Sequence, residues 1–456
     1  MQSVLLTHSN HLYSDPKQVR KMQPYPPLQT ILVASVLEAN GIQAHLFDPT
    51  FEYSEQAFRN AIGKARPDLI VVCEDDFNFL TKMCLAQNRR LAFEMAAITA
   101  DYGIRAIAHG SDASDHTTEY LDAGFDAIAI GEVETTVLDI AQGKPIGEID
   151  GLTLRVAGAI QRNRARTAMA DLDTLPAPSW DLVEIEKYRA AWKRSHGYFS
   201  LNLASSRGCP FRCNWCAKPI YGNRYRVRSA AALAAEMLAM KRTSRPDHLW
   251  FCDDIFALSP AWTFRFADEV KARDASIPFK MQSRCDLMTR DTVTALRTAG
   301  CEEVWMGAES GSQRVLDAMD KDLYVEEIYR ARSNLRRNGI RACFFLQFGY
   351  PGEEWADIEA TIRMVRETRP DNVGISVSYP LPGTKFHQIV STQMGAKANW
   401  ESSADVSLIF RGAYSTEFYR ALADALHIEV RGGAGARAAW LRVEELREFT
   451  GAGAAA

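Results

Sequence analysis

The chain has 456 residues, of which 47% are apolar and 24% are charged. At about 150 residues per domain, this length allows two or three domains with sizeable cores. The composition excludes a disordered, collagenous or small disulfide-stapled protein. The 53 basic and 57 acidic side chains give a net charge of −4, so we expect no general attraction to nucleic acids or anionic membranes.

No apolar run approaches the ~18 residues that a membrane-spanning helix needs. The N-terminus also lacks a basic region followed by a long apolar stretch. We therefore expect a cytoplasmic protein without a membrane segment.

Residues 1–145 alternate short β-rich apolar runs with longer helical patterns, which predicts a doubly wound, Rossmann-like α/β domain. The expected strands are Ser3 to Thr7, Gln43 to Phe47, Leu69 to Cys73, Arg105 to His109 and Ala127 to Ile130. Ligands of such sheets bind beyond the carboxyl ends of the strands. Polar residues and glycines stand there in this chain: His8 to Asn10, Glu74 to Asp76, Gly110 to Asp112, and Gly131 with Glu132.

Residues 146–194 are predicted to be a hairpin followed by a linker. The hairpin covers Gly151 to Arg164 and turns at Gly158. Asp171 to Trp180 contains two prolines and few periodic apolar residues, so we expect extended chain and a domain boundary there.

Residues 195–395 alternate strand and helix again, which predicts a partial (β/α)6 TIM-like barrel with its active site at the carboxyl ends of the strands. The expected strands are Leu201 to Ala204, His248 to Cys252, Phe279 to Gln282, Glu303 to Met306, Ala342 to Phe348 and Asn372 to Ser378. Residues 396–456 are expected to form a small, mostly helical extension that ends in a frayed tail from Gly451.

Three cysteines stand close together directly after the first barrel strand, in the run Ser206-Arg-Gly-Cys209-Pro-Phe-Arg-Cys213-Asn-Trp-Cys216. Three thiolates on one short loop can hold three irons of a [4Fe–4S] cluster and leave the fourth iron open. A zinc site needs a fourth protein ligand, and the next Cys or His is His248, thirty-two residues further on. The spacing therefore favours the cluster, which makes these cysteines the candidate metal ligands and catalytic residues.

The cysteine spacing, with the aromatic Trp215 before the last cysteine, resembles the radical S-adenosylmethionine (SAM) superfamily. Other segments that fit are Phe251 to Phe256, Gly307 to Ser312, Phe348 to Glu353 and Tyr379 to Thr384. The resemblance implies a SAM molecule bound to the open iron. It also implies SAM contacts from Trp215, Asp253, Asp254, Arg284, Glu309, Ser310 and Gln347.

Two of these assignments have alternatives. Many relatives place Gly-Gly-Glu where this chain has Asp253 and Asp254, and these aspartates could instead cap the following helix. Arg284 and Glu309 could instead belong to a buried structural ion pair.

The N-terminal domain resembles the cobalamin-binding domain of one branch of this superfamily. The resemblance rests on Tyr25-Pro-Pro-Leu28, on Asp48 at a strand end, and on Gly131-Glu-Val-Glu134-Thr. It implies corrinoid contacts from Tyr25, Pro26, Pro27, Leu28, Glu74, Asp75, His109, Gly110, Ser111, Gly131 and Glu132. The D-x-H-x-x-G loop that gives cobalt a histidine is missing, so we interpret His11 as a loop histidine rather than a ligand. The alternative is a domain that only packs on the barrel.

A basic group of Lys218, Arg224, Arg226 and Arg228 follows the cysteine loop, and is either solvated surface or a site for an anionic part of the substrate. The resemblance implies an enzyme that uses a 5′-deoxyadenosyl radical on an unactivated C–H bond of a small molecule, with C-methylation as the usual outcome. Ring formation or rearrangement is the alternative outcome, and a non-catalytic cobalamin-binding sensor is the alternative class. We expect a one-electron donor such as flavodoxin or ferredoxin, and neither nucleic acid nor membrane as a partner.

Overall fold

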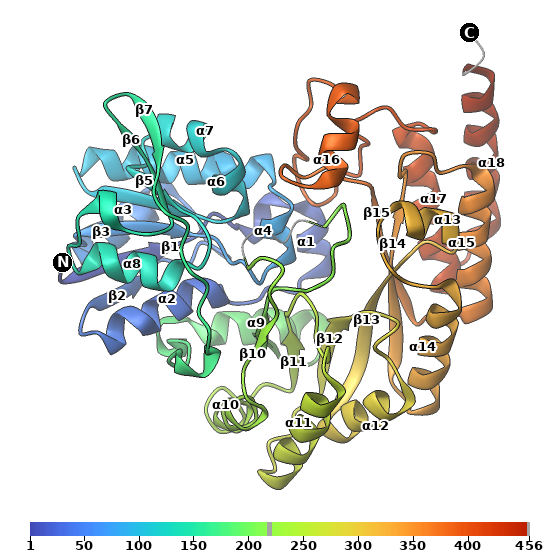
Figure 1. Ribbon diagram of the computed structural model, residues 1–456, viewed down its shortest axis with the longest axis horizontal. Helices are drawn as coiled ribbons and strands as arrows, with labels where there is room; N and C mark the ends of the chain where they lie inside the picture. Colours follow the sequence, from blue (N-terminus) through green and yellow to red (C-terminus); the bar gives the residue numbers. More distant parts are fainter. Residues whose placement is uncertain (217–220, 454–456) are drawn as a thin grey trace.

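The structure is a computed structural model that describes residues 1–216 and 221–453. Two α/β units lie side by side, the first made by the N-terminal part of the chain and the second by the rest (Figure 1). This is the predicted fold class. The predicted boundaries at residues 145, 195 and 395 stay predictions.

The N-terminal unit is built on a seven-stranded sheet in the order β2-β1-β3-β4-β5-β6-β7. Neighbouring strands from β2 to β5 are parallel, whereas β6 and β7 are antiparallel to their neighbours. The strands are β1 (Ser3–Thr7), β2 (Gln43–Leu46), β3 (Leu69–Cys73), β4 (Arg105–His109), β5 (Ala127–Ala129), β6 (Leu152–Val156) and β7 (Ala159–Arg162). The five strands predicted for this domain are confirmed.

The predicted hairpin exists, and β6 pairs with β5, so the hairpin extends the sheet of the N-terminal unit. Ala127 lies opposite Leu154, and Ala129 lies opposite Leu152. Both leucines are buried on the same apolar face as the parallel strands. The sequence showed the hairpin but not the strand beside which it lies.

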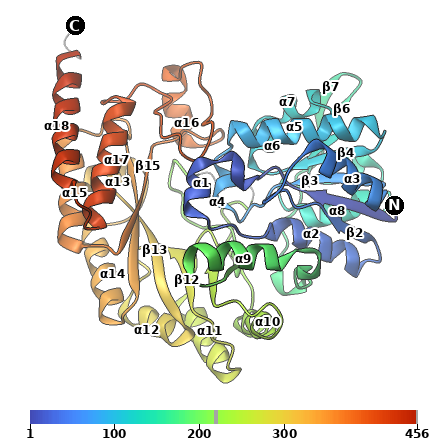
Figure 2. The same cartoon turned by 180° about the vertical axis from the view of Figure 1, so that it is seen from behind.

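Helices cover both faces of this sheet (Figures 1 and 2). One core contains residues of α2 and α8, and the other contains residues of α3, α5 and α7. The helices are α1 (Pro16–Lys21), α2 (Leu28–Ala39), α3 (Glu55–Ala65), α4 (Phe79–Lys82), α5 (Ala86–Asp101), α6 (Ser111–Asp115), α7 (Thr117–Asp122) and α8 (Val133–Ala141).

The second unit is a parallel six-stranded sheet in the order β8-β11-β12-β13-β14-β15, as the prediction of a partial barrel requires. Its strands are β8 (Ser200–Leu203), β11 (His248–Phe251), β12 (Phe279–Ser283), β13 (Cys301–Glu309), β14 (Arg341–Phe348) and β15 (Asn372–Val377). Its helices are α10 (Ala230–Arg242), α11 (Pro260–Ala272), α12 (Arg290–Ala299), α13 (Gln313–Ala318), α14 (Val325–Arg337) and α15 (Trp355–Thr368).

Burial alternates along the middle strands of the barrel. In β12, Phe279, Met281 and Ser283 are buried, whereas Lys280 and Gln282 are partly exposed. Successive side chains of a strand point to opposite faces. The buried set therefore packs under the helices, and the other set lines the concave side.

The connecting segment is less extended than predicted. It contains the short 3-10 turns Leu172–Thr174 and Trp180–Leu182, followed by the helix α9 (Ile185–His196). Trp192 of α9 is buried and donates from Nε1 to the carbonyl of Pro24 at 2.7 Å. This helix therefore joins the two units.

The C-terminal extension is helical as predicted, with α17 (Thr416–Val430) and α18 (Ala436–Gly453), and the short helix α16 (Lys385–Val390) precedes it. The tail expected to fray from Gly451 begins inside α18, and residues 454–456 lie outside the described residues. In the described part of the chain, no helix is both long and apolar enough to cross a membrane.

Candidate functional site

The cysteine loop is held at its base by a two-stranded ribbon, in which β9 (Ser206–Arg207) pairs antiparallel with β10 (Arg226–Val227). Cys209 is buried, while Cys213 and Cys216 are partly exposed. Gly208 has a φ of +77°, and a Cβ at this position would stand 2.3 Å from the carbonyl oxygen of Arg224. Only glycine fits at this entry to the loop.

Cationic side chains surround the loop. Arg284 Nη1 lies 4.0 Å from the Sγ of Cys213, and its guanidinium stands 3.7 Å from the ring centre of Phe211. Lys321 Nζ lies 5.8 Å from the ring centre of Trp215. Cysteine binds iron as the thiolate, and nearby cations can balance the negative charge of three thiolates. The chemistry of this donor set therefore fits a cluster held by three cysteines.

The three thiols share one loop without converging on one point. Within residues 1–216 and 221–453, no group of three or more His, Cys, Asp or Glu side chains is arranged to hold a metal ion. The backbone N–H of Cys216 donates to the carbonyl of Cys213 at 3.3 Å, which places these two cysteines on one turn. The side chains of the loop must turn toward one another to share a cluster.

Asp253 and Asp254 follow β11, and neither caps the next helix, since Ser259 is the N-cap of α11. Asp253 is buried and accepts hydrogen bonds from the hydroxyls of Ser205 at 2.6 Å and Ser206 at 2.5 Å. Burial raises the pKa of Asp253 to about 6. Asp254 instead pairs with Lys82 of the N-terminal unit at 2.5 Å.

Arg284 and Glu309 are both buried, and each is held in an ion pair with another residue rather than with the other. Arg284 donates to the carbonyl of Lys321 at 2.8 Å and pairs with Asp286 at 2.9 Å. Glu309 accepts from Lys321 Nζ at 2.8 Å. Lys321, which lies beside Trp215 of the cysteine loop, therefore contacts both Arg284 and Glu309.

The other predicted SAM contacts end neighbouring strands. Ser310 Oγ lies 3.1 Å from Thr361 Oγ1, and Gln347 donates to Ser378 at 3.0 Å. All of these side chains lie at the carboxyl edge of the barrel sheet, where the fold predicts a ligand.

Two members of the basic group after the loop are held in ion pairs. Arg226 pairs with Glu132, and Arg228 pairs with Glu236. Lys218 lies outside the described residues. The ion pairs favour a structural role for these two arginines over the binding of an anionic substrate group.

The edge of the N-terminal sheet carries buried acids. Glu74 Oε1 accepts from the backbone N–H of Ser9 at 2.7 Å, and its Oε2 has no partner among the described residues. His109 contacts Asp76 at 2.8 Å, and the other oxygen of Asp76 has no partner in that part of the chain. Burial alone would lower the pKa of His109, but the charge and hydrogen bond of Asp76 raise it above the ordinary value.

Glycines and small residues complete this edge. Gly110 has a φ of +137°, and a Cβ there would stand 2.7 Å from the Cβ of Glu74. Ser111 follows it as the first residue of α6. A Cβ on Gly131 would meet nothing within 4 Å, so the edge is open at that point.

The segment from Tyr25 to Leu28 contacts both units. Leu28 begins α2 directly after Pro27, and its backbone N–H donates to Asp75 at 3.3 Å. Tyr25 packs on Trp250 with ring centres 4.7 Å apart, and its hydroxyl lies 3.2 Å from that of Ser200. Because Ser200 is the first residue of β8, Tyr25 lies at the amino end of the barrel strands, away from the cysteine loop.

Pro26 and His11 also make contacts within the protein. The carbonyl of Pro26 accepts from Asn202 at 2.9 Å. His11 contacts the carbonyl of Pro49 at 2.8 Å and lies beside Tyr13, as expected of a loop histidine.

The carboxyl edges of the two sheets meet at a buried ion pair that the sequence did not reveal. Arg207, at the base of the cysteine loop, pairs with Glu134 and lies 3.8 Å from Glu132. Gln29 donates to Glu134 at 3.0 Å and accepts from Tyr221 at 2.6 Å. Nothing in the sequence indicates that Arg207 and Glu134, 73 positions apart, form a pair.

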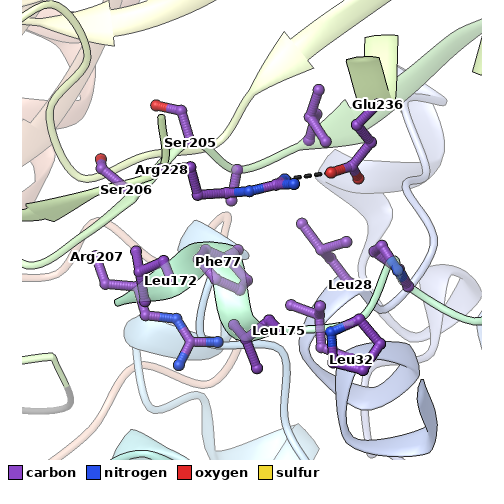
Figure 3. A pocket seen from close by; sticks show the side chains of 14 residues that line it. Leu28, Leu32, Phe77, Leu172, Leu175, Ser205, Ser206, Arg207, Arg228 and Glu236 are labelled. Atoms are coloured by element: carbon purple, nitrogen blue, oxygen red, sulfur yellow. Dashed lines mark hydrogen bonds and ion pairs between the residues drawn. The ribbon is translucent and has the colours of Figure 1, made fainter. Parts of the chain in front are cut away.

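A small cavity of about 30 Å³ lies beside this ion pair (Figure 3). Leu28, Leu32 and Phe77 of the N-terminal unit and Leu172 and Leu175 of the connecting segment form an apolar wall. The polar wall consists of Ser205, Ser206, Arg207, and the ion pair of Arg228 with Glu236. The space is bordered by both units and by the segment that joins them.

Comparisons with known proteins agree with this architecture. Residues 203–365 match the Radical SAM superfamily model. The chain is 25% identical to an uncharacterized methyltransferase of Pyrococcus horikoshii over 65% of this chain and 68% of that protein. It is 24% identical to the anaerobic magnesium-protoporphyrin IX monomethyl ester cyclase of Rubrivivax gelatinosus, over 80% of this chain and 66% of the cyclase.

Two solved structures share the fold of both units. TsrM from Kitasatospora setae, a radical S-adenosylmethionine methyltransferase solved with cobalamin and a [4Fe–4S] cluster, matches with a TM-score of 0.70 at 18% identity, over 86% of this chain and 75% of that one. OxsB, a cobalamin-dependent S-adenosylmethionine radical enzyme, matches with a TM-score of 0.69 at 17% identity, over 85% of this chain and 55% of that one. Residues 203–365 therefore match a radical SAM domain, with the three-cysteine loop after the first strand of its partial barrel, and the chain has the two-domain fold of TsrM and OxsB.

Proposed function

We propose that this protein is a cobalamin-dependent radical SAM enzyme that C-methylates an unactivated carbon of a small molecule. The observation that carries the proposal is the meeting of the two ligand edges. The cysteine loop at the carboxyl edge of the barrel is joined by Arg207 and Glu134 to the carboxyl edge of the N-terminal sheet. Groups bound at the two edges would therefore face one substrate.

Cys209, Cys213 and Cys216 would hold the cluster, and Arg284 and Lys321 would balance its negative charge. A bound cluster supplies the electron that opens a C–S bond of SAM. The barrel residues bind and orient SAM: Asp253 and Glu309 offer carboxylates to amino and hydroxyl groups, and Arg284 offers a guanidinium to a carboxylate.

The N-terminal edge would hold the corrinoid, whose rim carries amide groups. The unpartnered oxygens of Glu74 and Asp76 can accept hydrogen bonds from such amides. The open space at Gly131 leaves room for a ring at the same edge. The alternative is that this domain only packs on the barrel.

Ring formation is the second candidate outcome, because the cyclase of Rubrivivax gelatinosus aligns with 80% of this chain. Methylation is favoured by the similarity to TsrM, a radical SAM methyltransferase, and to the uncharacterized methyltransferase of Pyrococcus horikoshii. A small-molecule substrate and a one-electron donor such as flavodoxin or ferredoxin complete the proposal. Three free thiols on one loop also favour the reducing cytoplasm as the location.

The first experiment tests radical chemistry. Anaerobically reconstituted protein with a reductant and SAM should bind about four irons per chain and release 5′-deoxyadenosine. Cys213→Ala should lose both, whereas Cys301→Ala, which removes a buried thiol away from the loop, should keep both. A Cys213→Ala protein that cleaves SAM at the wild-type rate contradicts the assignment, and absence of cleavage by the wild type favours the sensor.

Product analysis separates methylation from ring formation. Methylation uses one SAM for the radical and a second as methyl donor, so turnover should give 5′-deoxyadenosine and S-adenosylhomocysteine in equal amounts. Ring formation gives only the first product. Substrate-dependent release of 5′-deoxyadenosine without S-adenosylhomocysteine would replace methylation by the second candidate.

Corrinoid binding is tested by incubation with hydroxocobalamin and desalting. A stoichiometric pigment should stay with the wild type and with His11→Ala, because His11 lies in a surface loop and contacts Pro49. Colourless wild-type protein after several loading conditions would favour a domain that only packs on the barrel.

A further inference from the structure

Lys280 places a cation on the concave side of the barrel, at the amino end of the strands. Its Nζ lies 5.6 Å from the ring centre of Tyr25, 5.8 Å from that of Trp250 and 6.0 Å from that of Trp192. Among the described residues, no carboxylate lies within ion-pair distance of this ammonium, and no hydrogen bond satisfies its three donors.

Glu303 is the carboxylate on the neighbouring strand, but other groups bind it. Arg341 Nε donates to one of its oxygens at 3.0 Å, and Trp305 Nε1 donates to the other at 2.7 Å. The three rings around Lys280 stabilise its charge by cation–π contacts, but they cannot accept its N–H bonds as an oxygen does.

A second cation, Lys21 of the N-terminal unit, lies near this group: its carbonyl contacts His196 Nε2 at 3.0 Å, and the ring centre of His196 lies 4.9 Å from that of Trp192. Lys21 ends α1, the short helix that lies between β15 and the N-terminal sheet (Figure 2). Burial and then the charge of Lys280 lower the pKa of Lys21, and the charge of Arg431 adds to this effect. Asp15, which caps α1 and accepts from the backbone of Ser403 at 2.8 Å, opposes the charge of Lys21, and Glu303 opposes that of Lys280. Positive charge therefore exceeds negative charge on this side of the barrel.

Aromatic side chains line the concave wall between this cation pair and the cysteine loop. Trp305 and Phe345 have ring centres 5.0 Å apart and are both partly exposed. A Cβ on Gly374 would stand 3.0 Å from Phe345 and 3.3 Å from Trp305, so both rings pack against the bare backbone of this glycine. The wall thus offers flat apolar surface with polar groups at its two ends.

We propose that Lys280 and Lys21, with the rings of Tyr25, Trp192 and Trp250, form a subsite that binds the carboxylate of a flat, apolar substrate. The inference rests on the proposed function, which places the substrate inside the barrel. Lys280 stands three residues before Ser283, and a strand rises about 3.3 Å per residue, so the carboxylate lies roughly 10 Å from the edge that carries Arg284 and the cysteine loop. The substrate's acid group and its reacting carbon are therefore at opposite ends.

Competitive labelling of the full chain tests this subsite without iron or SAM. An amine-reactive acetylating reagent is applied in short pulses, and peptide mass spectrometry gives the labelling rate of each lysine. Indole-3-propionate should slow the labelling of Lys280 and Lys21 several-fold, whereas its neutral amide should not. Lys271, exposed on the outer face of α11, is the internal control and should be labelled at the same rate throughout.

Two variants give an independent measurement of binding. Lys280→Met keeps the length of the side chain and should weaken indole-3-propionate binding by about tenfold, the value of one charge-assisted contact. Lys21→Met, at the end of α1 and outside the barrel core, should weaken it in the same direction, and Lys271→Met should leave it unchanged.

Equal protection by the acid and the amide, or no protection by the acid, overturns the proposal. Protection by inorganic phosphate but not by the acid overturns the assignment to a carboxylate. Since this assay needs no SAM cleavage, protection combined with inactive reconstituted protein would reject the proposed function and keep the subsite. Active protein whose lysines are not protected by the acid would reject the subsite and keep the proposed function.

Discussion

Glutamine in place of Glu134 tests the buried ion pair that joins the two ligand edges. The side chains of Arg207 and Glu134 are 2% and 1% exposed, so the remaining arginine charge cannot be solvated by water. Removing one partner of a buried pair costs about 3–5 kcal/mol. Glu132 stays 3.8 Å from Arg207 and compensates in part, which puts the expected loss at the lower end, about 3 kcal/mol.

The matched control is Glu119→Gln, which removes an ion pair with Arg89 on the surface of the same domain. Glu119 is 54% exposed, so this variant should lose less than about 1 kcal/mol. Urea unfolding followed by tryptophan fluorescence gives the free energy of unfolding for each variant. A Glu134→Gln protein within about 0.5 kcal/mol of the wild type would refute the reasoning.

The pH dependence of the same difference gives a second check. Burial alone would raise the pKa of Glu134, but the charge and hydrogen bond of Arg207 hold it below the ordinary 4.5. A carboxylate with a lowered pKa stabilises the folded state above its unfolded pKa, and the contribution is lost as the pH falls through the folded pKa. The difference between wild type and Glu134→Gln should therefore be constant above pH 4.5 and shrink below it.

Three further predictions follow from single contacts. Gly208→Ala should prevent iron binding, because its Cβ would stand 2.3 Å from a backbone oxygen. The control Gly222→Ala should keep iron, because its Cβ would meet nothing within 4 Å. The measurement is the iron content per chain after reconstitution. Burial raises the pKa of Glu353 to about 8, so the stability of the wild type should fall as the pH rises from 4.5 toward 8. Glu353→Gln should show no such fall. A difference in melting temperature between the two proteins that is the same at every pH would contradict this. Lys82→Met leaves Asp254 unpaired between the two units and should lower the free energy of unfolding by about 1–2 kcal/mol in urea.

Much of the fold could be predicted because its signals are local. The strands Leu69–Cys73 and Arg105–His109 are continuous apolar runs with polar residues at their carboxyl ends, and the structure has them at the predicted bounds. The cysteine loop was found by spacing alone. Such features depend on neighbours in sequence, so the sequence contains them in full.

The contacts between distant segments could not be predicted. The pairing of β6 with β5 depends on which edge of the sheet is free, and the burial of Tyr25 on Trp250 depends on how the two units pack. Asp254 was predicted to touch SAM, and its partner in the structure is Lys82, 172 residues away in sequence. No periodicity or motif links such residues, since their proximity arises only in the folded chain.

The ion pair between Arg207 and Glu134 also explains why the two units keep one alignment. Apolar contacts are not directional, and a slide of the two units would exchange one such contact for another at little cost. A buried guanidinium has no such freedom, because a displacement of a few ångströms leaves two charges without partners. Arg207 stands two residues before Cys209, and Glu134 stands two residues after Glu132 at the opposite edge. The contact that fixes the alignment therefore lies where a group bound by the cysteines would meet a group bound by the N-terminal sheet.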